Sequence, residues 1–74
     1  MGIFIFNDYV VFHKLTPIKL INKVLKGLNA KFPIDINPNY TVEKDFYKYT
    51  FKECLSDETL KEAYIYLSKF NKNA

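Results

Sequence analysis

The sequence predicts a small α+β domain in which a mainly antiparallel sheet carries two helices on one face. Three observations lead to this fold class. From Tyr47 to Lys52 aromatic and polar side chains alternate, which is typical of a strand with one buried face. The segments 17–28 and 57–70 carry apolar residues at the spacing of amphipathic helices. The chain has 74 residues, of which 49% are hydrophobic, enough for one core. We therefore expect a single two-layer domain over residues 1–74, with the order ββαββα.

The first two strands are predicted to form a hairpin. Ile3–Phe6 and Tyr9–His13 are short β-branched and aromatic runs, and the Asn-Asp pair between them tolerates left-handed backbone. A two-residue turn at this pair sets the register, with Phe4 opposite Val11. The other face of the hairpin then carries Ile3, Ile5, Val10 and Phe12.

The first helix is expected to begin at Thr16, with its hydroxyl as the N-cap and Pro17 in the first helical position. Gly27 and Asn29 supply a stop signal after the apolar stripe. That stripe consists of Ile18, Leu20, Ile21, Val24, Leu25 and Leu28.

The second pair of strands follows. In Phe32–Asn37 apolar residues alternate with others, and Pro33 predicts an edge position for this half-buried strand. Apolar side chains fall on even positions from Tyr40, but on odd positions by Tyr47. Such a slip of one residue requires either a bulge or a second tight turn near residues 43–45, and we expect a bulge or bend there.

The second helix has a clear start. Ser56 is expected to cap it, and the acidic residues Asp57 and Glu58 fall in its first turn, where the helix dipole favours negative charge. Ile65 lies off the apolar stripe and is therefore expected to be exposed. We expect residues 70–74 to form a frayed tail. The stripe consists of Leu60, Ala63, Tyr64, Leu67 and Phe70.

The chain offers little for catalysis. Its one histidine, His13, and its one cysteine, Cys54, lie in different hairpins, whereas catalysis needs a nucleophile or metal with a base and an orienting group. We expect Cys54 to be a small buried hydrophobic residue and His13 to lie at the surface end of a strand; a Cys–His pair that meets in space is the alternative. Metal-ligand spacings and glycine-rich phosphate loops are absent from the sequence. It therefore predicts a protein that is not an enzyme and has no cofactor, metal or small-molecule substrate.

The cysteine count and the N-terminal segment bear on location. A single cysteine cannot form an intrachain disulfide, which is typical of a reducing compartment. The apolar run at the N-terminus is interrupted by Asp8 and is too short for a signal peptide or a membrane span. We expect a cytoplasmic protein without membrane contact.

The uncovered sheet face is the candidate binding surface, because it combines aromatic rings with lysines, as protein interfaces do at their centre and rim. The sequence predicts a protein-binding module of accessory, inhibitor or adaptor type, of the kind that phages and mobile elements encode. Its partner is expected to be another protein or a second copy of the chain. The residues expected to contact the partner are Phe4, Phe6, Tyr9, Lys48, Thr50, Lys52 and Ile65.

Nucleic-acid binding is the alternative. The net charge is +3, and all the basic residues are lysines, which cannot make the planar bidentate contacts that read guanine in duplex DNA. Rings on a sheet can nevertheless stack on bases while lysines neutralise phosphates. The lysines of the first helix fit this role or that of a solvated helix face equally well. The residues of this alternative are Lys19, Lys23, Lys26, Lys48 and Lys52.

Overall fold

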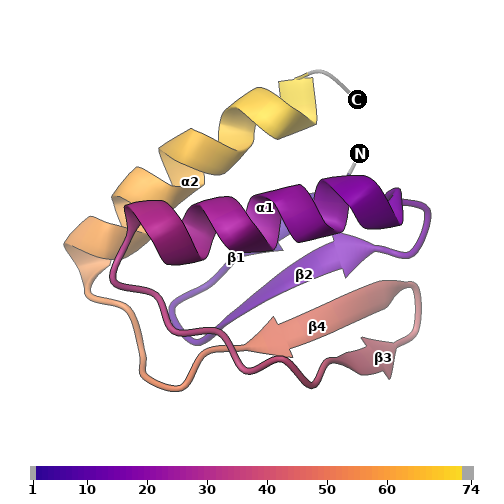
Figure 1. Ribbon diagram of the computed structural model, residues 1–74, viewed down its shortest axis with the longest axis horizontal. Coiled ribbons are helices and arrows are strands. Elements are labelled where there is room, and N and C mark those ends of the chain that lie inside the picture. The colour runs from indigo at the N-terminus through magenta and orange to yellow at the C-terminus, as the bar shows by residue number, and fades with distance from the viewer. Residues whose placement is uncertain (1, 73–74) are drawn as a thin grey trace.

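The computed structural model describes residues 2–72, which form four antiparallel strands and two helices in the order ββαββα (Figure 1). The helices α1 (Ile18–Lys31) and α2 (Asp57–Lys72) lie on the same side of a single sheet (Figure 1). The predicted α+β class and element order are therefore confirmed. The strands, in the spatial order β1-β2-β4-β3, are β1 (Ile3–Ile5), β2 (Tyr9–His13), β4 (Phe46–Thr50) and β3 (Thr41–Glu43).

The first hairpin has the predicted register. Phe4 pairs with Val11, and the Phe6 N–H donates to the Tyr9 carbonyl at 2.8 Å across the two-residue turn. The His13 N–H donates to a carbonyl of the residue before β1, Gly2, at 2.8 Å. Because these bonds involve the even-numbered residues that flank β1, the backbone groups of Ile3 and Ile5 point away from β2.

The second hairpin also closes with a two-residue turn. Glu43 pairs with Phe46, which leaves Lys44 and Asp45 as the central residues. Lys44 has a φ of 51°, the left-handed region that tight hairpin turns use. The expected bulge near residues 43–45 is therefore wrong. The change from even to odd apolar positions arises because the chain reverses there.

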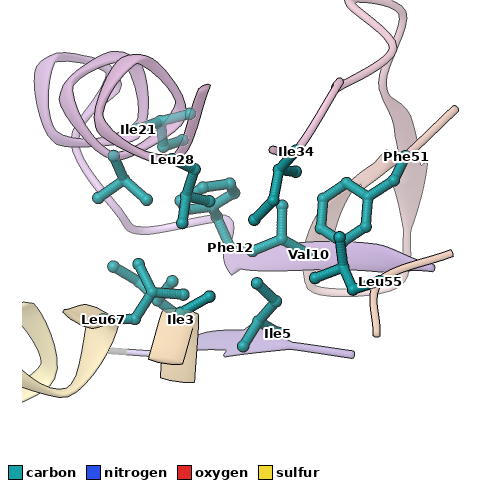
Figure 2. Close-up of a cluster of buried hydrophobic side chains, with 12 residues drawn as sticks. Ile3, Ile5, Val10, Phe12, Ile21, Leu28, Ile34, Phe51, Leu55 and Leu67 are labelled. Carbon is teal, nitrogen blue, oxygen red and sulfur yellow. The ribbon is translucent and has the colours of Figure 1, made fainter. Parts of the chain in front are cut away.

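One hydrophobic cluster fills the space between the sheet and the helices (Figure 2). Its sheet side includes Val10 and Phe12, both fully buried, and the ring of Phe12 meets that of Tyr49 edge to face at 5.7 Å. Tyr47 and Phe51 lie on this same side of the sheet, as predicted. Each Leu, Phe or Val that is fully buried contributes about 1.5–3 kcal/mol. The helices contribute Ile21, Val24, Leu28, Ala63 and Leu67.

The helix α1 starts one residue later and ends later than its signals predict. Pro17, not Thr16, is the N-cap residue, and no side chain caps the helix. The Thr16 hydroxyl points instead into the interior, where it has no hydrogen-bond partner among residues 2–72. The helix continues to Lys31 because Gly27 does not adopt the left-handed conformation that ends a helix. The missing side chain of Gly27 leaves room for Tyr66 of α2.

The segment from Phe32 to Ile36 is not a strand, contrary to prediction. Within it only Ile36 pairs, as an isolated bridge to Phe51. Its alternating pattern has another cause: Ile34 is buried in the core, 2% exposed, while its neighbours face solvent. Pro33 has no N–H, so it cannot contribute a donor to a ladder here.

The start of α2 is as predicted, and its end is not. The Ser56 hydroxyl accepts a hydrogen bond from the Thr59 N–H at 3.2 Å, as an N-cap does. The helix extends to Lys72, so the expected frayed tail is wrong for residues 70–72; residues 73–74 lie outside the described residues. Asn71 reaches β1, where its Oδ1 accepts the Ile3 N–H at 3.2 Å and its Nδ2 donates to the Ile3 carbonyl at 3.0 Å.

Each helix leaves one residue of its predicted stripe in solvent. Ile18 at the start of α1 is 66% exposed, and Tyr64 of α2 is 65% exposed. The helix α2 packs over β1, which is the edge strand of the sheet. No further strand lies next to β1 in this four-stranded sheet, so the side of α2 that carries Tyr64 stays uncovered. Tyr66 packs instead, against Phe32 at 5.7 Å and Phe70 at 5.4 Å. Neither α1 nor α2, the helices of the described part, has the length and apolarity needed to cross a membrane.

Candidate functional site

The face of the sheet that points away from the helices carries a group of aromatic side chains. Phe4 and Phe6 are 49% and 44% exposed. The Phe6 ring lies 4.7 Å from that of Tyr9, and the Phe4 ring meets that of Phe46 edge to face at 6.3 Å. We call these four rings, together with Val11 between them, the outer aromatic patch.

The strand register explains why these side chains meet. Phe4, Val11 and Lys48 are direct neighbours across β1, β2 and β4. Residues that face one another across antiparallel strands project to the same side of the sheet. Thr50 lies opposite Tyr9 and belongs to the same face. The predicted contact residues of the two hairpins are thus brought together.

A shallow hollow of about 290 Å³ lies across the patch. Its apolar part is the outer aromatic patch, and a charged pair, Glu43 and Lys48, completes its lining. The Lys48 Nζ lies 3.4 Å from the Glu43 carboxylate and 4.4 Å from the centre of the Tyr9 ring. The hollow therefore offers apolar surface beside one cation and one anion, a composition that suits another protein's side chains.

Two of the predicted contact residues lie elsewhere. Ile65 is exposed, as expected, but it belongs to α2 on the other side of the sheet. Lys52 lies beyond the end of β4, where its Nζ is 3.8 Å from the Asp35 carboxylate. Neither residue lines the hollow.

The lysines of the nucleic-acid alternative do not form one surface. Lys19, Lys23 and Lys26 are exposed on α1, in the helix layer, whereas Lys48 projects from the opposite face of the sheet. Lys48 also has a carboxylate beside it, as Lys52 does. A phosphate backbone would meet the helix lysines or the sheet lysines, but not both groups at once.

His13 and Cys54 lie at opposite ends of β4. The His13 ring packs edge to face on Phe46 at 5.5 Å, and its Nδ1 accepts the Leu15 N–H at 3.1 Å. Cys54 follows β4 and is exposed; the expectation of a buried cysteine is wrong because the next residue, Leu55, takes the core position. Among residues 2–72 no group of three or more His, Cys, Asp or Glu side chains could hold a metal ion.

A second hollow, of about 450 Å³, lies between α1 and the segment before β3, next to Tyr40 and Tyr49. Burial raises the pKa of the Tyr49 hydroxyl above its ordinary value of 10.0, and the neighbouring Tyr40 and Tyr47 add to this. The Tyr49 hydroxyl is therefore a neutral hydrogen-bonding group near pH 7.

Sequence reasoning missed three residues of the hollow: Val11, Glu43 and Phe46. The parity of β4 could have identified Phe46, because it lies an even number of residues from Lys48. The face of the sheet on which Glu43 lies depends on the turn at Lys44-Asp45, and the sequence left the type of this turn open.

Comparison with protein-family models, with curated proteins and with solved structures found no match for this chain.

Proposed function

We propose that the protein is a small, non-enzymatic binding module that docks another protein on its outer aromatic patch. The observation that carries this proposal is the exposure of Phe4 and Phe6, together with their continuity with Tyr9 and Phe46 in one hollow. Large aromatic side chains bury much area on contact and are enriched at interface centres. Contiguous exposed apolar patches are a common feature of protein interaction sites, which supports this proposal.

The charges around the patch favour a protein over a nucleic acid. Glu43 lies beside Lys48, so this face presents a carboxylate where a phosphate would approach. A protein partner can satisfy both charges with side chains of its own. Nucleic-acid binding needs uncompensated lysines along one surface, and its affinity would fall steeply with salt.

An accessory, inhibitor or adaptor role fits a module with a docking surface, and within residues 2–72 the one histidine and the one cysteine lie at opposite ends of β4. We also propose a reducing, cytoplasmic location, because the one cysteine, Cys54, is exposed and cannot form an intrachain disulfide. Fractionation of cells that express the tagged chain tests the location; secretion into the medium would contradict it.

Photo-crosslinking tests the docking surface. A photoreactive residue at Val11, in the middle of the patch, should capture a protein from a native lysate. Phe6→Ser should abolish this capture, whereas Tyr64→Ser removes a ring of α2 that is more exposed, 65% against 44%, and should leave it intact. Equal loss in both variants would contradict a role for this face. Capture of labelled oligonucleotides in place of a protein would favour the nucleic-acid alternative.

A further inference from the structure

The positive charge of the protein is concentrated on α1. This helix carries four lysines and no Asp or Glu, whereas the whole chain has a net charge of +3. The rest of the chain therefore has a net charge of −1, which is the +3 of the chain less the +4 of α1. A charge asymmetry of this kind indicates a surface for an anionic partner.

Three of these lysines share one side of the helix. Lys19, Lys23 and Lys26 follow the spacing i, i+4, i+7, so they form a row over about 10 Å of the helix axis. All three side chains are exposed. Within residues 2–72 none of them forms an ion pair, although three lysines outside the helices do. We call these three residues the lysine row.

The second hollow, of about 450 Å³, adjoins the lysine row. Lys26 belongs to its lining, and the exposed amides of Asn22 and Asn29 lie on the same wall. The other wall includes the rings of Tyr40 and Tyr49, whose centres are 5.3 Å apart. Tyr40 is 52% exposed, so its ring still offers surface for stacking. The volume lies in the range of sites that hold small ligands.

We propose that this side of α1 binds a single strand of nucleic acid, with a base in the second hollow and the neighbouring phosphates at the lysine row. The base stacks on the Tyr40 ring, and the amides of Asn22 and Asn29 meet its edge, because amide side chains pair with the donors and acceptors of bases. The lysines neutralise the phosphates as point charges. Rings beside a positive groove are typical of surfaces that bind single strands.

The composition of the hollow favours this occupant over other anions. An acidic protein segment also carries negative charge, but a base combines a flat aromatic face with hydrogen-bonding edges, which rings beside amides accommodate. In a duplex the bases are stacked inside the helix, so none can enter the hollow. The one carboxylate of the lining, Asp35, lies 3.8 Å from the Lys52 Nζ, so its charge is compensated.

This site is separate from the outer aromatic patch. The helix α1 lies on one side of the sheet, and the patch lies on the opposite face (Figure 1). A protein on the patch and a nucleic acid on α1 can therefore be bound at the same time. The site does not depend on the proposed protein docking.

Fluorescence anisotropy of the full chain with labelled oligothymidylate, oligouridylate and a duplex, each of about 10 nucleotides, tests the proposal. Either single strand should bind at low salt, and the stronger of the two identifies the natural class, DNA or RNA. The logarithm of the binding constant should fall with that of the salt concentration at a slope of about −2, since each of three phosphates contributes about −0.7.

Two pairs of variants test the residues. Lys26→Gln should make the salt slope shallower by about 0.7, whereas Lys61→Gln removes the same charge from an exposed position of α2 and should not change it. Tyr40→Ala should weaken binding about 5- to 150-fold, the effect of losing one stacked base. Tyr64→Ala removes an exposed ring from α2 and should leave the affinity unchanged.

Absence of binding at low salt overturns the proposal, as does a Tyr40→Ala or Lys26→Gln variant that binds like the wild type. Equal affinity for the duplex, or for polyglutamate of the same charge, would show a general anion surface and equally overturn it. In ¹⁵N NMR the bound strand should shift amides along residues 19–29 and at Tyr40. Shifts at Phe4 and Phe6 instead would move binding to the outer aromatic patch and contradict the proposal, and this wild-type map decides even where a variant fails to fold.

Discussion

Replacing Gly27 of α1 with alanine tests whether Tyr66 holds the two helices together. Alanine stabilises a helix interior by about 1 kcal/mol relative to glycine. At this position, however, the new Cβ would overlap the Tyr66 hydroxyl oxygen and lie 3.0 Å from Cζ of the ring. Two opposing effects therefore act on the free energy of unfolding.

The surroundings of Tyr66 determine which effect is larger. Its ring is held between Phe32 and Phe70, and the Lys69 Nζ lies 4.5 Å from its centre. Moving a packed side chain costs about 1–3 kcal/mol. After the helix gain of about 1 kcal/mol, Gly27→Ala should lower the free energy of unfolding by about 0–2 kcal/mol.

A double-mutant cycle separates the two effects. In the Tyr66→Phe background the overlapping oxygen is gone, so Gly27→Ala should be neutral or stabilising by up to about 1 kcal/mol. Urea unfolding followed by circular dichroism measures each variant, and about 1 kcal/mol corresponds to a midpoint shift of about 1 M for a small domain. Asn29→Ala, on the exposed side of α1, is the control for helix propensity alone.

Equal stabilisation of the wild type and of Tyr66→Phe by Gly27→Ala would show that Tyr66 does not hold the two helices together. A coupling energy near zero would mean that the Tyr66 ring can move away from position 27 without a loss of stability.

Three further predictions concern other parts of the fold. Asn71→Ala removes two hydrogen bonds to Ile3 and should cost about 1–3 kcal/mol in urea unfolding, with faster amide exchange at Ile3. Lys44→Gly should stabilise the protein by up to about 1 kcal/mol, seen as a higher Tm, because glycine adopts the left-handed φ of 51° without strain. Alkaline pH should destabilise the fold: the raised pKa of Tyr49 favours its neutral form in the native state, so this contribution is complete below about pH 10 and is lost as pH rises further. Thermal melts from pH 8 to about pH 12 should show the loss, and Tyr49→Phe should reduce it.

Each of these has a clear contrary result. Unchanged stability in Asn71→Ala would show that water replaces the side chain at β1 without loss. A lower Tm for Lys44→Gly would mean that the entropy of the unfolded chain outweighs the relief of strain. A Tyr49→Phe variant with the wild-type alkaline profile would assign the loss to other tyrosines.

The regular parts of the fold could be predicted because local chemistry determined them. The Asn-Asp turn set the register that pairs Phe4 with Val11, and Ser56 capped α2 as expected. The segment before β3 could not be predicted in this way. Burial of Ile34 between helix and sheet produces the same alternation as a strand, and only tertiary packing distinguishes the two.

The part of the candidate site that depends only on the alternation of side chains along a strand could be predicted. Phe4 and Lys48 were assigned to the outer face from alternation alone. Whether Glu43 lies beside Lys48 depends on the type of turn between β3 and β4, which the sequence left open. Ile65 was grouped with this face because its exposure alone does not show whether it lies in the helix layer or on the sheet. The exposure of Cys54 depends on which of two adjacent apolar residues turns inward, which composition does not encode.

The bonds between Asn71 and Ile3 also affect the order in which the domain forms during translation. The two residues are 68 positions apart, so β1 leaves the ribosome long before the side chain that closes its edge. Until then the strand can pair with β2 but exposes its outer backbone groups to other nascent chains. Contacts of such sequence separation are costly in loop entropy and form late. The Ile3 backbone groups that Asn71 covers in the native protein are thus open until α2 has been synthesised, and exposed strand edges are prone to aggregate.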